Sequence, residues 1–285
     1  MLRTLVRLAA WGLVALPSAA VAAPQAAEPA PVQWRVSAQR PTPTFQAPER
    51  LAVAPDAGRS PVWTPEGVFA NAPVRWRGLA KAERSGAAVY DPSTLAWYAA
   101  AVGAVVRVDA DGRLPVVAQG VQGTDVDVRA ARGLAVSREP DDRIVLHRFG
   151  VPGSARTVLL RGEFFHPRFS ADGTRILVAE SRQGESWFKV VDLTGRTVAQ
   201  TRGSGAAWHP DGRRVVFQRA ENDGYRVTAS DLWQIDVASA REERVTATPG
   251  VREMNPTPSP DGRWLAYVDD ATGDLCVAAF PLARR

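Results

Sequence analysis

The 285-residue chain contains a single cysteine, Cys276, so an intrachain disulfide is excluded. Cys276 lies in the apolar stretch DLCVAAF (residues 274–280), where a small buried side chain is a commoner role than a nucleophile. Stability must therefore come from packing, and the hydrophobic content of 45% is typical of a globular protein with a core.

Lysine is equally scarce. Lys81 and Lys189 are the only lysines, and arginine carries nearly all the positive charge behind the formal net charge of +5. No run of basic residues is present. Because nucleic-acid binding requires a clustered basic patch, a nucleic-acid partner is not expected.

Long hydrophobic runs are also missing, apart from a short one near the N-terminus. Residues 1–22 combine Arg3 and Arg7 with the apolar stretch Leu8–Leu16 and the small-x-small sequence Ala20-Val21-Ala22, which predicts a secretory signal peptide. The alternative is an N-terminal membrane anchor, but a spanning helix needs about 20 apolar residues. We expect a periplasmic or secreted protein that is not transmembrane after cleavage.

The rest of the chain divides by composition. Residues 23–48 are rich in alanine, proline and glutamine and are predicted to form an extended linker. From residue 49 to residue 285, short apolar runs alternate with Gly, Pro and Asp turns, and helical periodicity is almost absent. This pattern predicts a single all-β domain.

One hairpin sequence is written three times: FSADGTRILVAE (169–180), WHPDGRRVVFQR (208–219) and PSPDGRWLAYVD (258–269). Its Asp-Gly turns begin at Asp172, Asp211 and Asp261, which lie 39 and 50 residues apart. A period near 40 with several strands per unit is typical of β-propeller blades, which have four strands. With the weaker units before residue 160, the pattern predicts a six-bladed β-propeller.

The last unit, residues 255–280, stops after its third strand. The stretch ERLAVAPDAG (49–58) resembles the fourth-strand sequence ERVTATPG (243–250). We therefore expect the N-terminal strand to complete the last blade and close the ring. Closure leaves no long free sheet edge and favours a monomer.

The repeat resembles that of TolB-like propellers, whose pattern is roughly Pro-x-Phe-Ser-Pro-Asp-Gly followed by an apolar strand. TPSPDGRWLAYV (257–268) matches it closely, and SDLWQIDV (230–237) resembles its third strand. The resemblance covers residues 60–280 and is strongest after Phe164. It implies a non-enzymatic protein-binding module of the cell envelope, with an envelope protein or peptidoglycan-associated component as partner. TolB proteins have an α/β domain before the propeller, for which residues 23–48 are too short.

Few residues indicate chemistry. The Asp-Gly turns are expected to be structural, because Gly accepts positive φ and Asp bonds the turn backbone. The recurring tryptophans are expected to pack between blades. His166, in a first strand, is expected to face the central channel, with Arg168 and Asn255 near it at the channel mouth. No two histidines have metal-ligand spacing, and no Gly-x-Ser-x-Gly elbow is present.

The loops between second and third strands should share one face of a propeller. They comprise residues 138–143, 180–186, 219–226 and 269–274, and they carry carboxylates that include Asp269 and Asp270. Two interpretations remain open: solvated turns, or a rim for a cation or basic partner. Ca²⁺ prefers such oxygen ligands, but no EF-hand spacing exists, so no cofactor is expected. Tyr225, in the longest loop, is the candidate binding anchor.

These observations favour a binding module without catalytic residues. The alternative is a polysaccharide lyase or hydrolase with a site at the channel mouth, built from His166, Arg168 and Asn255. A purely structural scaffold is the third possibility.

Overall fold

The computed structural model describes residues 61–64, 67–70, 89–91, 94, 96–101, 103–109, 113–123, 125–150, 155–259 and 261–280. The secondary structure in these ranges is β-strand, apart from one 3₁₀ turn at Ala130–Arg132. No helix among these residues is long and apolar enough to cross a membrane. The predicted signal peptide, linker and closing strand (Glu49–Pro55) lie outside the described residues.

The strands form six small antiparallel sheets in chain order, as the blade repeat predicts. The first is the hairpin of β1 (Pro61–Thr64) and β2 (Gly67–Ala70). The second contains β3 (Val89–Asp91), β4 (Ala96–Ala101), β5 (Ala104–Val108) and β6 (Val116–Gln119). The third contains β7 (Asp125–Arg129), β8 (Leu134–Glu139), β9 (Arg143–Arg148) and β10 (Arg156–Arg161).

The C-terminal half repeats this arrangement. The fourth sheet contains β11 (Phe164–Phe169), β12 (Arg175–Arg182), β13 (Glu185–Asp192) and β14 (Thr197–Arg202). The fifth contains β15 (Ser204–Trp208), β16 (Arg214–Asn222), β17 (Val227–Asp236) and β18 (Glu242–Arg244). The sixth has three strands, β19 (Glu253–Pro258), β20 (Trp264–Asp269) and β21 (Asp274–Ala279). Several four-stranded units in series are the arrangement of propeller blades.

Each of the repeated hairpins turns on an Asp-Gly pair. Gly173, Gly212 and Gly262 have φ of 65°, 66° and 70°, a region that side chains disfavour. Within the turn, Asp172 accepts a hydrogen bond from the Thr174 amide at 3.0 Å, and Asp211 and Asp261 accept equivalent bonds from the residue two positions later. The turns therefore have the structural role that the sequence predicted.

The core lies between neighbouring sheets. The rings of Phe188 and Phe217, from the fourth and fifth sheets, are 4.9 Å apart and fully buried. Trp208 and Trp233 pack against the same cluster while keeping part of their surface exposed. Burying a side chain of this size contributes about 1.5–3 kcal/mol, so this interface holds the two sheets together.

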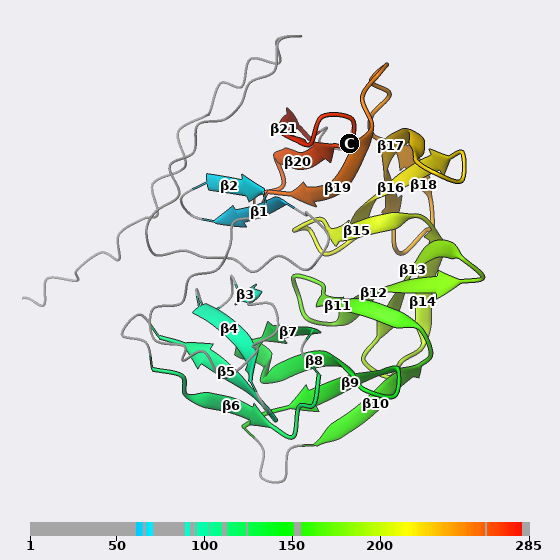
Figure 1. Ribbon diagram of the computed structural model, residues 1–285. Helices are drawn as coiled ribbons and strands as arrows, with labels where there is room; N and C mark the ends of the chain where they lie inside the picture. The colour runs from blue at the N-terminus through cyan, green and yellow to red at the C-terminus, as the bar shows by residue number, and fades with distance from the viewer. Residues whose placement is uncertain are drawn as a thin grey trace, which may run out of the picture. The chain divides into compact units, whose positions relative to one another are not determined.

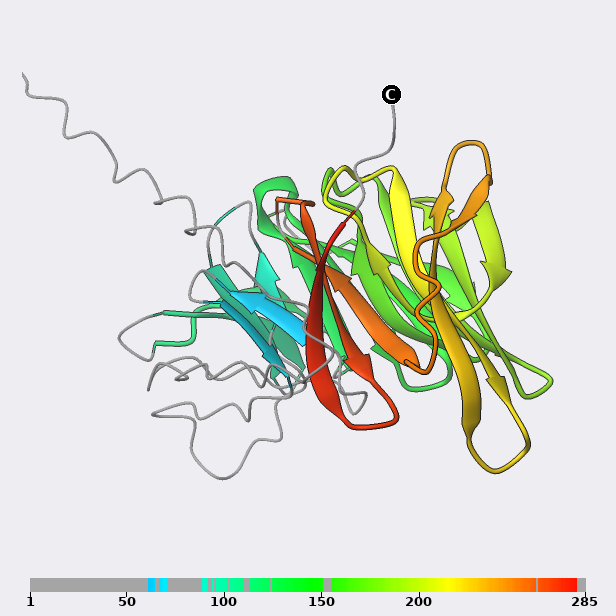
Figure 2. The same cartoon turned by 90° about the horizontal axis from the view of Figure 1, so that it is seen from above.

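The first strands join the sheets. β7 contacts β3, β11 contacts β7 and β8, β15 contacts β12 and β13, and β19 contacts β15, β16 and β17. We call β3, β7, β11, β15 and β19 the inner strands, because each lies on the inner side of its sheet (Figure 1). The hairpins β12–β13, β16–β17 and β20–β21 all point to one side of the molecule, as expected, and β16–β17 projects furthest (Figure 2).

Two predicted loops are shorter in the structure. Within residues 219–226, β16 continues to Asn222. Residues 180–186 were expected to form a loop, but β12 continues to Arg182 and β13 begins at Glu185. The connection is the two-residue turn Gln183-Gly184, with φ of 50° and 82°. Positive φ at both central residues matches the right-handed twist of the flanking strands, so they can pair up to the turn.

Candidate functional site at the beginnings of the inner strands

Three successive inner strands contain the same irregularity. In each, the inner strand has one residue more than the second strand with which it pairs. The extra residue lies between Phe165 and Arg168, between Ser204 and Ala207, and between Met254 and Thr257. The bulged positions His166, Gly205 and Asn255 have φ of 51°, 59° and 54°. We call these three positions the inner-strand bulges. Bulges of this kind re-aim side chains and are over-represented beside functional sites.

Positive φ is uncommon for residues other than glycine and costs about 1–3 kcal/mol. At two bulges a side chain of the preceding sheet holds the backbone in place. The His166 amide donates to Asp125 Oδ2 at 2.8 Å, and the Asn255 amide donates to Gln218 Oε1. At Gly205 a Cβ atom would lie 2.6 Å from Gln218 Oε1. Glycine there leaves the space through which Gln218 reaches Asn255.

Asp125 is the centre of the first bulge. Besides the bond from the His166 amide, its carboxylate accepts hydrogen bonds from His166 Nδ1 at 3.1 Å and from Arg168 Nη1 at 2.9 Å. Burial acts to raise the pKa of Asp125, but the charge of Arg168 and the bonds from both residues outweigh it and hold this pKa below its usual value. The carboxylate is therefore ionised, while the side chains of His166 and Arg168 remain 54% and 29% exposed.

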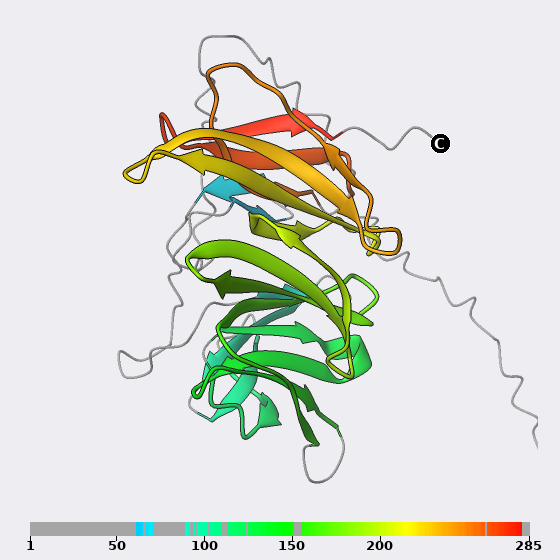
Figure 3. The same cartoon turned by 90° about the vertical axis from the view of Figure 1, so that its right-hand side faces the viewer.

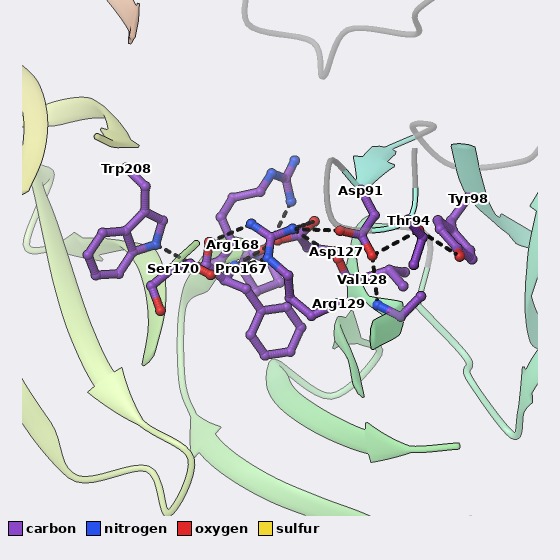
Figure 4. A network of polar contacts seen from close by, with 12 residues as sticks. Asp91, Thr94, Tyr98, Asp127, Val128, Arg129, Pro167, Arg168, Ser170 and Trp208 are labelled. Atoms are coloured by element: carbon purple, nitrogen blue, oxygen red, sulfur yellow. Dashed lines mark hydrogen bonds and ion pairs between the residues drawn. The ribbon is translucent and has the colours of Figure 1, made fainter. Parts of the chain in front are cut away.

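A second network joins four inner strands beyond these bulges (Figure 4). Arg129 Nε and Nη2 donate to the carbonyls of Ser170 and Phe169, both at 3.2 Å. Its Nη1 lies 3.9 Å from Asp91 and 4.0 Å from Asp127, which are both buried.

The same network continues to β15, because Trp208 Nε1 donates to the Arg168 carbonyl at 3.0 Å. Asp91 also accepts a hydrogen bond from the Ala130 amide at 2.8 Å, and Asp127 accepts one from the Phe169 amide at 2.7 Å. The groups that hold the inner strands together are thus charged and mostly buried, and they support the exposed bulges. The alternation in DVDVR (125–129) is the sequence signal that could have indicated them.

The predicted mouth residues are only partly brought together. His166 and Arg168 share Asp125, as a common site requires. Asn255 occupies the equivalent bulge two sheets further along the chain, and its backbone bonds to Gln218 instead.

Of the predicted loop residues, Asp269 and Asp270 make contacts within the protein, whereas Tyr225 is exposed. Asp269 caps the β20–β21 turn through the Ala271 amide at 2.9 Å, and Asp270 lies 3.3 Å from Arg252. Tyr225 is 99% exposed at the tip of β16–β17.

The carboxylates of the hairpin loops do not form an open acidic rim. Six of them pair with an arginine: Asp142 with Arg138, Asp141 with Arg143, Glu180 with Arg182, Glu185 with Arg202, Asp223 with Arg226, and Asp270 with Arg252. Across the ranges that the structure describes, no three His, Cys, Asp or Glu side chains are grouped to hold a metal ion. These contacts fit the interpretation of the loops as solvated turns.

One buried cluster has the residue types of a hydrolase triad. Ser137 Oγ lies 2.9 Å from His147 Nε2, but Glu139 Oε1 approaches the same nitrogen at 3.4 Å. A triad needs the acid on the other ring nitrogen, and His147 Nδ1 is buried without a partner. All three residues are 1–2% exposed. The cluster therefore cannot act as a triad.

Comparison with known proteins agrees with this architecture, although no family model matches the chain. A TolB homologue of Chlorobium luteolum is 25% identical over 112 residues, which is 38% of this chain and 24% of that protein. An uncharacterized protein of Agrobacterium fabrum is 30% identical over 111 residues, which is 37% of this chain and 36% of that protein. The matched region is thus well under half the length of each curated relative.

A solved structure from Agrobacterium tumefaciens, described as a presumed TolB, superposes with a TM-score of 0.50. The superposition covers 68% of this chain and 80% of that one at 16% identity, so it bears on the fold alone. The sheets, the Asp-Gly hairpins and these similarities lead to one conclusion: part of the chain is distantly similar to TolB in sequence, and the fold is that of a TolB-like β-propeller.

Proposed function

We propose that the chain is an exported propeller that binds an envelope partner, a protein or a peptidoglycan-associated component, at the inner-strand bulges. The observation that carries this proposal is the repeated positive φ at His166, Gly205 and Asn255. Strained backbone that recurs at one level of a fold and is held by neighbouring side chains is characteristic of ligand sites.

The chemistry of the bulges favours binding over catalysis. Asp125 is held ionised by Arg168 and His166, and a general acid or base needs a pKa near the working pH instead. Exposed His166 and Arg168 can donate hydrogen bonds to carbonyl or carboxylate groups of a partner. A lyase or hydrolase, the alternative function, would require a matched acid and base beside these residues.

The proposal includes six blades and a ring closed by residues 49–55. The three-stranded sixth sheet supports this, since β21 has no fourth strand beside it within the described ranges. A propeller closed in this way presents all its inner-strand beginnings around one opening. Export through the N-terminal signal sequence would bring this opening to the envelope.

The test is capture from an envelope extract by immobilised protein starting at Ala23. His166→Asn is the diagnostic variant, because Asn tolerates positive φ and the backbone bond to Asp125 can persist. Arg213→Ala, in the exposed Asp-Gly turn between β15 and β16, is the matched control. We expect the wild type and the control to capture the same partner, and His166→Asn to bind it about tenfold more weakly. Equal capture by all three would refute a site at the bulges.

A further inference from the structure

The fifth sheet has an incomplete outer edge. β17 runs from Val227 to Asp236, but β18 pairs only with Trp233–Ile235. The amides of Val245 and Thr246 then donate to the Leu232 carbonyl at 2.8 and 3.2 Å, after which the chain arches away from β17 (Figure 3). The chain returns to β17 at Arg252, which forms an isolated parallel β-bridge with Ser230. In the part of the chain that the structure describes, no strand pairs with the outer edge of Val227–Ala229.

A cleft of about 480 Å³ lies between this edge and the arch. It is lined by Thr228–Asp231, Arg244 and Ala247–Arg252. Its volume is within the range of ligand-binding pockets. The lining is mixed: it contains the hydroxyl residues Thr228, Ser230 and Thr248, the charged Asp231, Arg244 and Arg252, and small or apolar residues. The Ser230 hydroxyl already donates to the Glu253 carbonyl at 2.6 Å.

The charges at the cleft are neutralised within the protein. Arg244 Nη2 donates to Asp231 Oδ2 at 2.6 Å, and Arg252 Nε lies 3.3 Å from Asp270 Oδ2. A charged occupant would have to break one of these pairs, so an uncharged occupant is favoured.

Thr228 lies at an irregularity of the ladder between β16 and β17. Ala229 pairs with Glu221 and Val227 pairs with Asn222, so Thr228 is the extra residue of a bulge and lies opposite no residue of β16. Backbone donors and acceptors at such an edge can bond to an added strand.

The tip of the same hairpin presents an anchor. Tyr225 is 99% exposed, three positions before Thr228. Asp223 Oδ1 accepts the amides of Tyr225 and Arg226 at 2.9 and 3.0 Å, and Asn222 Oδ1 accepts that of Gly224 at 3.1 Å. These bonds hold the backbone of the turn, which lowers the ordering cost of the backbone on binding.

We propose that the outer edge of β17 binds an uncharged, extended polypeptide segment of the envelope partner. The segment lies antiparallel to β17 in continuation of β18, bonds to the backbone around Thr228, and packs an apolar side chain on Tyr225. This inference rests on the proposed function and adds a second contact, on the face to which the long hairpins point.

The probe is a phage-displayed library of seven-residue peptides restricted to Ala, Ser, Thr, Val, Asn, Gln and Tyr, screened against the protein starting at Ala23. Selected peptides are synthesised with N-methyl groups on odd or on even residues. We expect micromolar Kd values, a loss of tenfold or more for one methylated set but not the other, and about a tenfold loss with Tyr225→Ala. Arg196→Ala, an exposed change in the turn after β13, is the control and should bind normally.

Several outcomes would overturn the inference: no peptide binding tighter than about 1 mM, equal effects of both methylated sets, or binding of a chito-oligosaccharide by a protein that binds no peptide. Self-association in sedimentation that Thr228→Pro abolishes would assign the edge to a second copy instead. The result is separable from the proposed function. If His166→Asn leaves peptide binding intact, the peptide assay reports on the β17 edge alone. If envelope capture is weakened by His166→Asn but not by Tyr225→Ala, the proposed site at the inner-strand bulges stands and the proposed site at the β17 edge does not.

Discussion

Acidification should destabilise the propeller through His147, which lies on β9 and is 1% exposed. Burial lowers the pKa of His147 from 6.5 to about 4; the nearby Glu139 charge raises it, and Arg156 lowers it again. The folded state therefore favours the neutral ring. The stabilisation that comes from keeping His147 neutral is fully present above pH 6.5 and is lost as the pH falls through about 4.

The difference between these pKa values corresponds to about 3 kcal/mol of unfolding free energy at pH 4, at 1.36 kcal/mol per tenfold change in proton affinity. In a domain of this size such a loss lowers Tm by about 6–12 °C. The other charged group facing the cluster is Arg143, whose Nη2 lies 3.9 Å from Glu139.

The assay is urea unfolding of the wild type and His147→Gln at several pH values between 7.5 and 4. Gln can keep a hydrogen bond to Ser137 but does not titrate. The variant is expected to be less stable at neutral pH and to lose about 3 kcal/mol less than the wild type on acidification. Parallel stability curves for the two proteins would refute the assignment of this effect to His147.

Other positions give independent tests. Burial raises the pKa of Glu253, although hydrogen bonds from Thr246 and Thr248 act to lower it. The stability of the fold should therefore decrease as the pH rises through the folded-state pKa. Thermal melts between pH 4.5 and 8 should show a Tm that depends less on pH in Glu253→Gln than in the wild type. Arg129→Ala removes a cation that lies beside two buried carboxylates and should cost about 3–5 kcal/mol in urea unfolding, whereas the exposed Arg196→Ala should cost less than about 1 kcal/mol. Deleting residues 49–55 should lower Tm by several degrees if they close the ring, and an unchanged Tm would argue against closure.

The fold was predictable because its signals are local. An Asp-Gly pair between apolar strands specifies a hairpin through its own turn chemistry, and repetition of the hairpin specifies a series of sheets. The exposure of Tyr225 was predictable for the same reason, because a long polar loop places the residue at its tip in solvent.

The contacts within the site were not predictable, because they join residues about 40 positions apart. Nothing near His166 indicates that its backbone adopts positive φ, since the acceptor that holds it is Asp125 on another sheet. The arginine partners of the loop carboxylates were predictable only in part. Some lie close in the sequence, as Glu180 and Arg182 do, but others, such as Glu185 and Arg202, meet across neighbouring strands.

The backbone bonds at the bulges limit how the propeller can evolve. Asp125 and Gln218 each fix the shape of a strand in a following sheet, so neighbouring sheets are matched to each other and not only to a common repeat. Insertion of a repeat unit between two matched sheets, or loss of the unit that carries Asp125, would separate His166 from its acceptor and leave a strained backbone unsupported. The number of repeat units in such a protein is thus constrained by a few side chains that cross from one unit to the next.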